Sequence, residues 1–300
     1  MRGSRSDAES DANFAAVFLS PHFDDVALSC GGTVASVAAS GEQGRAQIVT
    51  VFGDVPPDGT VVTPYAQSLL AEWGAPLLAE AVRLRHAEDE AAARVLGASL
   101  VTLPFADGAF RGDTYPNWPA LQTTLAPADA DLPAQIAEAV RATGLLTRET
   151  TLIGPLGAGR HVDHQAVFAA LMLLAPDVAA IWLYEDFPYA ARNTDAVQSS
   201  LAAIGLTNSV PHTHDISGWL QTKIRAIACY TSQVPILFPE TSMPDAVHAY
   251  AEVVAGEAGA AERFWPLHSH SREKHLGLMR AQIDLPPNPF REKGERAYCT

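Results

Sequence analysis

Short apolar runs alternate with longer amphipathic segments along most of the chain. Apolar runs at residues 14–20, 46–52, 100–104, 151–154 and 179–184 predict buried strands. Segments with helical character lie between and after them, and Gly41 and Gly97 mark the expected ends of two of these helices. The predicted helices cover residues 26–39, 77–96, 132–143, 162–174 and 219–231. Strands that alternate with helices predict an α/β fold with a mostly parallel sheet and right-handed crossovers.

Two stretches rich in Pro, Gly, Thr or Asp interrupt this pattern. Residues 54–76 are interpreted as a loop or lid, and residues 105–133 as irregular structure. We find no internal repeat and no clean linker. Residues 14–300 are therefore predicted to form one domain, looser toward its C-terminus, behind a flexible tail of residues 1–13.

Net charge and cysteine spacing indicate which partners and which cellular compartment to expect. The formal net charge of -14 argues against nucleic acid and anionic membranes as partners. The three cysteines (Cys30, Cys229 and Cys299) show no CxxC spacing, which favours a reducing compartment. The polar N-terminal segment lacks the apolar centre of a signal peptide, and the apolar run 166–175 is too short to span a bilayer. We expect a soluble, cytoplasmic protein; its oligomeric state, a homo-oligomer included, stays open.

Polar clusters follow two of the predicted strands. Ser20-Pro21-His22-Phe23-Asp24-Asp25 leaves the first strand, and Arg160-His161-Val162-Asp163-His164 follows the fourth. Ligands of open parallel sheets bind beyond the carboxyl ends of the strands, so the two clusters, about 140 positions apart, should share one crevice.

The two clusters offer the ligands of a catalytic metal. A catalytic zinc usually takes three protein ligands and leaves a position for water, and His22, Asp25 and His164 would supply two nitrogens and one oxygen. This donor set also suits iron, cobalt or nickel. Such an ion lowers the pKa of its water toward about 7 and polarises a carbonyl.

Further groups remain beside these ligands. Asp24 is free to act as general base, and His161 could stabilise an oxyanion or protonate a leaving amine. Asp163 could hold an imidazole in the required tautomer. Each cluster alone is more typical of an ordinary helix start, but together, after two strands, they favour metal-assisted hydrolysis.

These motifs resemble those of one enzyme family. Residues 21–25 followed by Gly31-Gly32 resemble the PHPDD…GG signature of the LmbE-like/PIG-L zinc-dependent N-deacetylases, and residues 161–164 resemble its HxDH signature. Arg85-x-x-Glu88 with residues 91–97, and Lys223-x-x-Ala226 with Ser232-Gln233, are similar to its two weaker motifs. Phe23 and Val162 stand where the family usually has Pro, and residues 157–160 lack a Tyr that some members carry there.

The resemblance implies a Rossmann-like sheet and hydrolysis of the acetamide of an N-acetylglucosamine unit. By motif it implies that a zinc ion is the cofactor and that His22, Asp25 and His164 hold it. It makes Asp24 the base and His161 the charged partner of the intermediate, aided by Asp163. Arg85 and Asp107 resemble sugar-contacting positions.

Other interpretations stay open. The site could cleave another amide, such as that of a thiol-sugar S-conjugate, or the chain could be a nucleotide-binding α/β module. The chain lacks the G-x-G-x-x-G fingerprint of a dinucleotide-binding module, since residues 154–159 have the spacing G-x-x-G-x-G. Residues 184–189 are a candidate wall of a pocket for a small amino-sugar substrate. No role is assigned to a small set of further polar residues, namely Arg160, His212, His214, His268 and His270.

Overall fold

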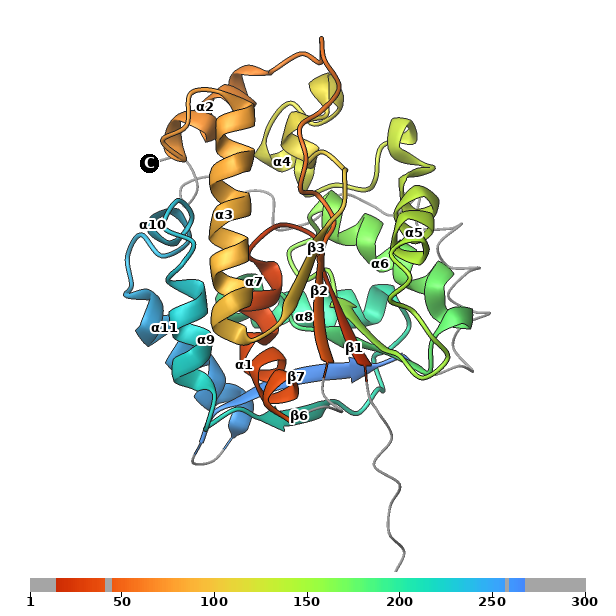
Figure 1. Ribbon diagram of the computed structural model, residues 1–300, viewed down its shortest axis with the longest axis vertical. Helices are drawn as coiled ribbons and strands as arrows, with labels where there is room; N and C mark the ends of the chain where they lie inside the picture. Colours follow the sequence, from red (N-terminus) through yellow and green to blue (C-terminus); the bar gives the residue numbers. More distant parts are fainter. Residues whose placement is uncertain (1–14, 41–44, 257–258, 268–300) are drawn as a thin grey trace, which may run out of the picture.

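A seven-stranded sheet forms the centre of the molecule (Figure 1). The computed structural model describes residues 15–40, 45–256 and 259–267. The strand order is β3-β2-β1-β4-β5-β7-β6. The strands are β1 (Ala15–Ser20), β2 (Arg45–Thr50), β3 (Ser99–Thr102), β4 (Thr151–Pro155), β5 (Ala180–Tyr184), β6 (His212–Asp215) and β7 (Ala261–Pro266).

The first five strands are parallel, as the alternating pattern predicts. β1 lies between β2 and β4 and pairs in parallel with both, with Phe18 opposite Ile48 on one side and Ile153 on the other. β7 pairs antiparallel with β5 and with β6. Because the chain moves to one side of β1 for β2 and to the other side for β4, the carboxyl ends of β1 and β4 flank the point where the strand order reverses.

Helices cover both faces of the sheet (Figure 1). α1, α3, α9 and α11 pack in one apolar cluster that includes Val34, Leu96 and Ile224. α5, α6 and α8 pack in a second that includes Ile136 and Leu171. The longer helices are α1 (Asp25–Ala39), α2 (Pro64–Glu72), α3 (Leu78–Leu96), α5 (Leu132–Ala142), α6 (Val162–Leu174), α8 (Thr194–Ala203), α9 (Leu220–Ile227) and α11 (Met243–Ala255). Single turns form α4 (Trp118–Leu121), α7 (Tyr189–Arg192) and α10 (Val234–Leu237).

The predicted loop at residues 54–76 is wrong in its second half, because α2 lies there. Thr63 accepts a hydrogen bond from the backbone N–H of Ala66, and Pro64 occupies the first turn, where its missing N–H costs nothing. Ala66 and Leu70 of α2 are buried. The Pro and Thr that suggested a loop are therefore the start signal of a helix.

The C-terminal part of the described chain completes the sheet. β6 was not predicted, because an edge strand with an exposed, polar sequence shows no apolar alternation. β7 was not predicted either, although its side chains are largely buried. Of the predicted irregular segment, residues 105–133, the part before α5 begins at Leu132 contains only short turns, as expected. These are α4, η1 (Gly108–Phe110), η2 (Gly112–Thr114) and η3 (Pro127–Asp129).

Some predictions fall outside the described residues. These are the tail at residues 1–13, Phe14, the stop at Gly41, His268, His270 and Cys299. Among the helices that the structure describes, none is long and apolar enough to cross a bilayer.

Candidate active site

The turn after β1 carries the first polar cluster. The Ser20 hydroxyl donates to the carbonyl of His22 at 2.6 Å and accepts from the N–H of Val26 at 3.1 Å. The N–H of His22 donates to Asp25 Oδ2 at 2.7 Å. These bonds fix the backbone so that His22, Asp24 and Asp25 stand at the N-terminus of α1.

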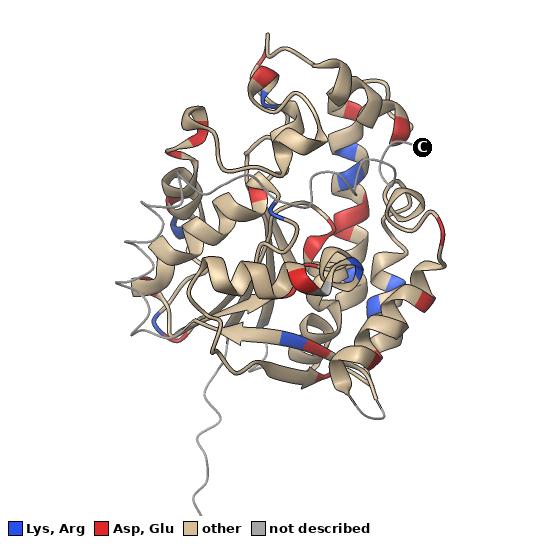
Figure 2. Cartoon of the chain, turned by 180° about the vertical axis from the view of Figure 1, so that it is seen from behind, with Lys and Arg blue, Asp and Glu red and all other residues tan. Residues whose placement is uncertain are grey.

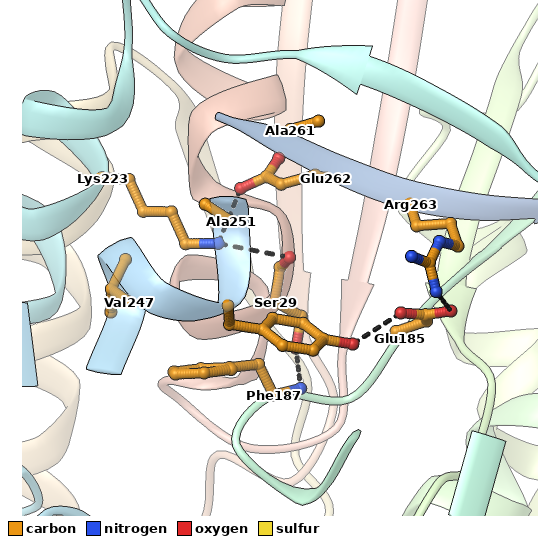
Figure 3. A pocket seen from close by; sticks show the side chains of 10 residues that line it. Ser29, Glu185, Phe187, Lys223, Val247, Ala251, Ala261, Glu262 and Arg263 are labelled. Atoms are coloured by element: carbon orange, nitrogen blue, oxygen red, sulfur yellow. Dashed lines mark hydrogen bonds and ion pairs between the residues drawn. The ribbon is translucent and has the colours of Figure 1, made fainter. Parts of the chain in front are cut away.

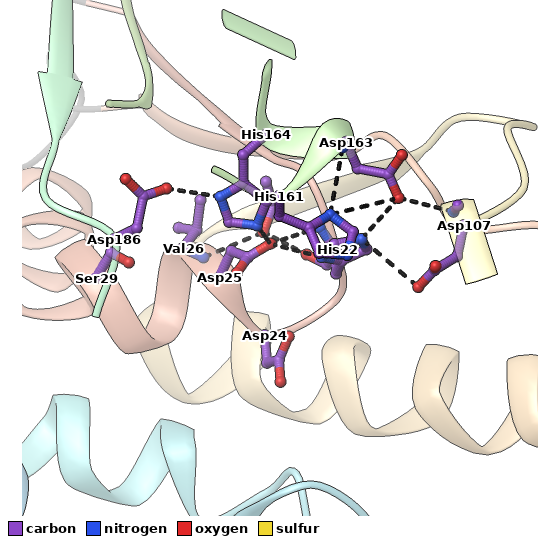
Figure 4. Close-up of polar contacts among 12 residues, drawn as sticks. His22, Asp24, Asp25, Val26, Ser29, Asp107, His161, Asp163, His164 and Asp186 are labelled. Carbon is purple, nitrogen blue, oxygen red and sulfur yellow. Dashed lines mark hydrogen bonds and ion pairs between the residues drawn. The ribbon is translucent and has the colours of Figure 1, made fainter. Parts of the chain in front are cut away.

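His22, Asp25 and His164 converge, as the two motifs predict (Figure 4). Asp25 Oδ2 lies 3.2 Å from Nδ1 of His22 and 3.3 Å from Nε2 of His164. Ligands of a tetrahedral ion at metal–ligand distances of about 2.0–2.2 Å lie about 3.4 Å apart. The spacing and the chemistry of these three donors therefore fit one metal ion.

Carboxylates contact the opposite nitrogens of both imidazoles. Nε2 of His22 lies 3.0 Å from Asp163 Oδ2 and 3.5 Å from Asp107 Oδ2. Nδ1 of His164 lies 2.6 Å from Asp186 Oδ1. These contacts leave Nδ1 of His22 and Nε2 of His164 facing Asp25, the arrangement found around histidine ligands of metals.

Asp163 orients more than the single histidine expected of it. Besides His22, it accepts from the N–H of Gly108 at 2.8 Å and lies 2.7 Å from Nη1 of Arg111. Its nearest approach to Nδ1 of His161 is 3.9 Å. His22, His161 and Asp163 are also close enough to hold an ion. Asp163 is already paired with Arg111, so we interpret this second set as the layer that orients His22.

Burial and neighbouring charges shift the pKa values in opposite directions. Burial opposes the charged form of His164, but Asp25 and Asp186 outweigh it and raise its pKa to about 10. Burial likewise opposes a charged His22, yet Asp107, Asp163 and Asp25 raise its pKa well above the usual value. Burial would raise the pKa of Asp25, but the two histidines hold it well below its ordinary value. The donors thus form a concentrated charge network, in which a cation would replace the protons on the imidazoles.

His161 differs from the other two histidines. Its Nδ1 accepts the backbone N–H of Asp163 at 3.3 Å at the start of α6, which leaves Nε2 to carry the proton. Burial lowers the pKa of His161 to about 4, although Asp163 opposes this shift. His161 is therefore neutral near pH 7 and presents an N–H donor.

Asp24 points away from the three candidate ligands and contacts Arg85 (Figure 4). Nη2 of Arg85 lies 3.3 Å from Asp24 Oδ1. Burial raises the pKa of Asp24, while Arg85 acts in the opposite direction. The guanidinium of Arg85 in turn lies 4.9 Å from the centre of the Trp73 ring and 5.3 Å from that of Phe23.

A pocket opens over these groups. Its walls include the predicted residues Arg85 and Asp107, together with Trp118 and Gln233, whose place there the sequence did not predict. Of the predicted wall at residues 184–189, Phe187, Pro188 and Tyr189 line the pocket. Asp186 contacts His164 instead.

Comparison with known proteins places this arrangement in a family. The family model described as PIG-L, GlcNAc-PI de-N-acetylase, matches residues 17–175. A 2'-N-acetylparomamine deacetylase of Streptomyces fradiae is 34% identical over 228 residues, 72% of this chain and 72% of that protein. The chain belongs to the PIG-L family. A second 2'-N-acetylparomamine deacetylase, from Niallia circulans, is 27% identical over 91% of this chain and 96% of its own length.

Solved structures agree with this PIG-L assignment. A deacetylase of the teicoplanin biosynthesis pathway superposes with a TM-score of 0.70 at 27% identity, over 84% of this chain and 97% of that one. The zinc-inhibited form of a teicoplanin deacetylase gives a TM-score of 0.68 at 27% identity and the same coverage. The protein is therefore a PIG-L deacetylase, which confirms the predicted fold and enzyme class.

Sequence reasoning missed the roles of two residues that contact the PIG-L motifs, although Asp186 lies in the predicted pocket wall. Asp186 follows β5 as the two clusters follow β1 and β4, so its place at the same sheet edge was a usable signal. Arg111 lies in the irregular segment and gave no such signal. His212 and His214 belong to β6, and neither is among the groups of described residues that could hold an ion.

Gly154 has a structural role. It lies within β4, where an added Cβ would come within 2.5 Å of the Leu171 side chain. Gly157 and Gly159 adopt φ angles of 81° and 90°, a region that favours glycine, so the glycine-rich segment is explained without a phosphate-binding loop.

Proposed function

We propose that this chain removes the acetyl group from an amino sugar of the 2'-N-acetylparomamine type, with a zinc ion held by His22, Asp25 and His164. The convergence of these three donors beneath a pocket that also holds Asp24 and His161 carries the proposal. Two relatives that match most of the chain are named for this substrate.

The metal ion would supply Lewis-acid chemistry, and the side chains would orient the groups and move the protons. When bound, a divalent ion acts as a Lewis acid toward the acetamide carbonyl and lowers the pKa of a coordinated water. Asp163 and Asp186 orient the two imidazoles for it.

Asp24 is the proposed general base. Its carboxylate is buried, lines the pocket and pairs with Arg85 rather than with the metal-binding histidines. Burial raises its pKa, which strengthens it as a proton acceptor at neutral pH. We propose that Asp24 takes a proton from the attacking water and delivers one to the leaving amine.

His161 is the proposed donor to the carbonyl oxygen. The bond from Asp163 N–H to its Nδ1 assigns the proton to Nε2, which can donate to the oxygen as negative charge develops there. That charge would raise the proton affinity of the imidazole during the reaction. The neutral ground state is therefore compatible with a charged partner of the intermediate.

The proposal is tested with purified protein and 2'-N-acetylparomamine. We expect about one zinc per chain, loss of hydrolysis on chelation, and its return with zinc. Asp24→Asn should keep the metal and lower kcat about 10²–10⁴-fold, because it removes only the base. His164→Ala should lose the metal itself.

Metal content by elemental analysis and release of free amine are the two measurements. A zinc-loaded Asp24→Asn variant with near-normal kcat would refute the base assignment. A control outside the pocket, Asp177→Asn, should leave both readouts unchanged, since Asp177 pairs with Arg141 where α5 and α6 end.

A further inference from the structure

A buried hydrogen-bond chain runs from α3 to the wall of the pocket. Glu88, one turn beyond Arg85 on α3, is 6% exposed. Its Oε1 accepts from the Thr231 hydroxyl at 2.7 Å and from the N–H of Ser232 at 2.8 Å. Its Oε2 accepts from the Ser232 hydroxyl at 2.6 Å. Glu88 thus holds the turn that follows α9.

The next residue of this turn reaches the pocket. Gln233 is 6% exposed, is the N-cap residue of α10 and lines the pocket together with Ile236 and Leu237. Its Nε2 donates to the Ser232 Oγ at 3.0 Å. The Gln233 amide is therefore a polar group on a wall that α10 otherwise makes apolar.

The chain of hydrogen bonds determines which way this amide faces. The Ser232 hydroxyl has one hydrogen, and it is used on a carboxylate oxygen that can only accept. Ser232 Oγ can then only accept from Gln233, which must turn its NH₂ toward it. Oε1 of Gln233, at the other end of the amide, then faces away from Ser232 and can accept a hydrogen bond.

We propose that Gln233 is a specificity-determining residue whose Oε1 accepts a hydrogen bond from a sugar hydroxyl of the substrate, with its polarity set by Glu88 through Ser232. The proposal rests on the proposed function of the same pocket. It predicts that this subsite prefers a donor group and rejects a group of equal size that can only accept.

The test uses monodeoxy and monofluoro analogues of the N-acetylated sugar, assayed for amine release with zinc-loaded protein. Fluorine cannot donate, so at one ring position both analogues should raise KM about threefold to tenfold with kcat within about twofold. In Gln233→Ala this penalty should fall to within about twofold, because the acceptor is gone. The exposed control Gln221→Ala should keep the wild-type penalty.

The variant Glu88→Gln tests whether Glu88 determines which end of the Gln233 amide faces the pocket. The amide nitrogen that this substitution introduces would donate to Ser232 Oγ, so that the hydroxyl hydrogen turns to Gln233 and the Gln233 NH₂ faces the pocket. The fluoro analogue should then equal or surpass the hydroxyl substrate at that position. Ser232→Ala breaks the chain of hydrogen bonds and should abolish the preference in either direction.

A purely structural Gln233 would change KM for every analogue alike and leave all penalties in place, which would overturn this inference while the proposed function stands. Absence of hydrolysis by the wild-type protein on every N-acetylated sugar would overturn the proposed function, and this inference with it. A penalty that is lost in Gln233→Ala and reversed in Glu88→Gln would establish the contact.

Discussion

Individual carboxylates decide how the histidines of this site are oriented. His22 and His164 each turn one nitrogen toward Asp25 and the other toward a second Asp. Asp186 makes the shorter of these outer contacts and also accepts from the N–H of Ala158 at 2.8 Å. Asp186, which lies outside the proposed ligand set, therefore orients the imidazole of His164.

Asp186→Asn should weaken zinc binding about tenfold to a hundredfold, the usual cost of losing such a partner. An asparagine keeps the size of the side chain but not its charge. Competition with a chromophoric chelator measures the affinity. An unchanged affinity would assign Asp186 a purely structural role, which unfolding experiments on the same variant would reveal.

A second buried carboxylate lies on α3 behind the site. Asp89 accepts from the hydroxyls of Tyr230 and Thr50, both at 2.7 Å. Burial raises its pKa to about 7, although these two hydrogen bonds favour the charged form. The folded state therefore holds a proton on Asp89 at a pH at which the unfolded chain has released it.

The raised pKa of Asp89 makes the stability of the protein depend on pH. Between the unfolded and folded pKa values the native state binds more protons, so this group's contribution to the free energy of unfolding falls as pH rises. Asparagine does not titrate. Between about pH 5 and about pH 8, we therefore expect the free energy of unfolding of Asp89→Asn to rise by on the order of 2 kcal/mol relative to that of the wild type. Urea denaturation at both pH values measures the difference. A constant difference would contradict the raised pKa.

At the scale of elements, α1 depends on a strand far along the chain. The helix is interrupted at Cys30, whose φ of -140° is not helical. The N–H groups that this break frees, on Gly32 and Thr33, donate to the carboxylate of Glu262 in β7 at 2.9 and 2.8 Å. Lys223 of α9 pairs with the same carboxylate at 2.7 Å (Figure 3).

Breaking this buried pair should destabilise the protein strongly. Lys223→Met leaves the charge of Glu262 without its cationic partner and should lower the free energy of unfolding by about 3–5 kcal/mol. The double variant Lys223→Met with Glu262→Gln should recover part of the loss, because the uncompensated charge is gone. Chemical denaturation of both variants measures this. Equal losses in the two would show that packing, and not the charge, dominates.

At the scale of the whole molecule, acidic residues exceed basic ones by 34 to 20 (Figure 2). They are spread over many elements. Four of them (Asp24, Asp25, Glu72 and Asp107) line the pocket, where Arg85 is the one Lys or Arg among the described lining residues, beside His22 and His161. The net charge of -14 on the whole chain attracts cations toward the molecule.

We therefore expect KM for an N-acetylated substrate with further, cationic amines to rise several-fold between low and high salt, as the field is screened. KM for the neutral N-acetylglucosamine should change by less than about twofold under the same conditions. Steady-state assays at several ionic strengths make the comparison. An equal salt response for both substrates would exclude charge as a source of selectivity.

Prediction from sequence succeeded where the information is local. The five parallel strands follow from apolar runs, and His22 and His164 could be placed together because each follows a strand of the same sheet. α2 was missed although Thr63 and Pro64 form a recognisable helix start, since the composition of its surroundings dominated the interpretation.

The sequence by itself determined the fold class and the convergence of His22, Asp25 and His164 at one edge of the sheet, because strand order and motif position restrict where those side chains can lie. Only the tertiary structure decided which carboxylate faces which imidazole, that Glu262 completes α1, and that Gln233 reaches the pocket. The physical reason is that these contacts join segments up to 230 residues apart. Their partners are selected by distances across a folded sheet, which leave no periodic signal along the chain.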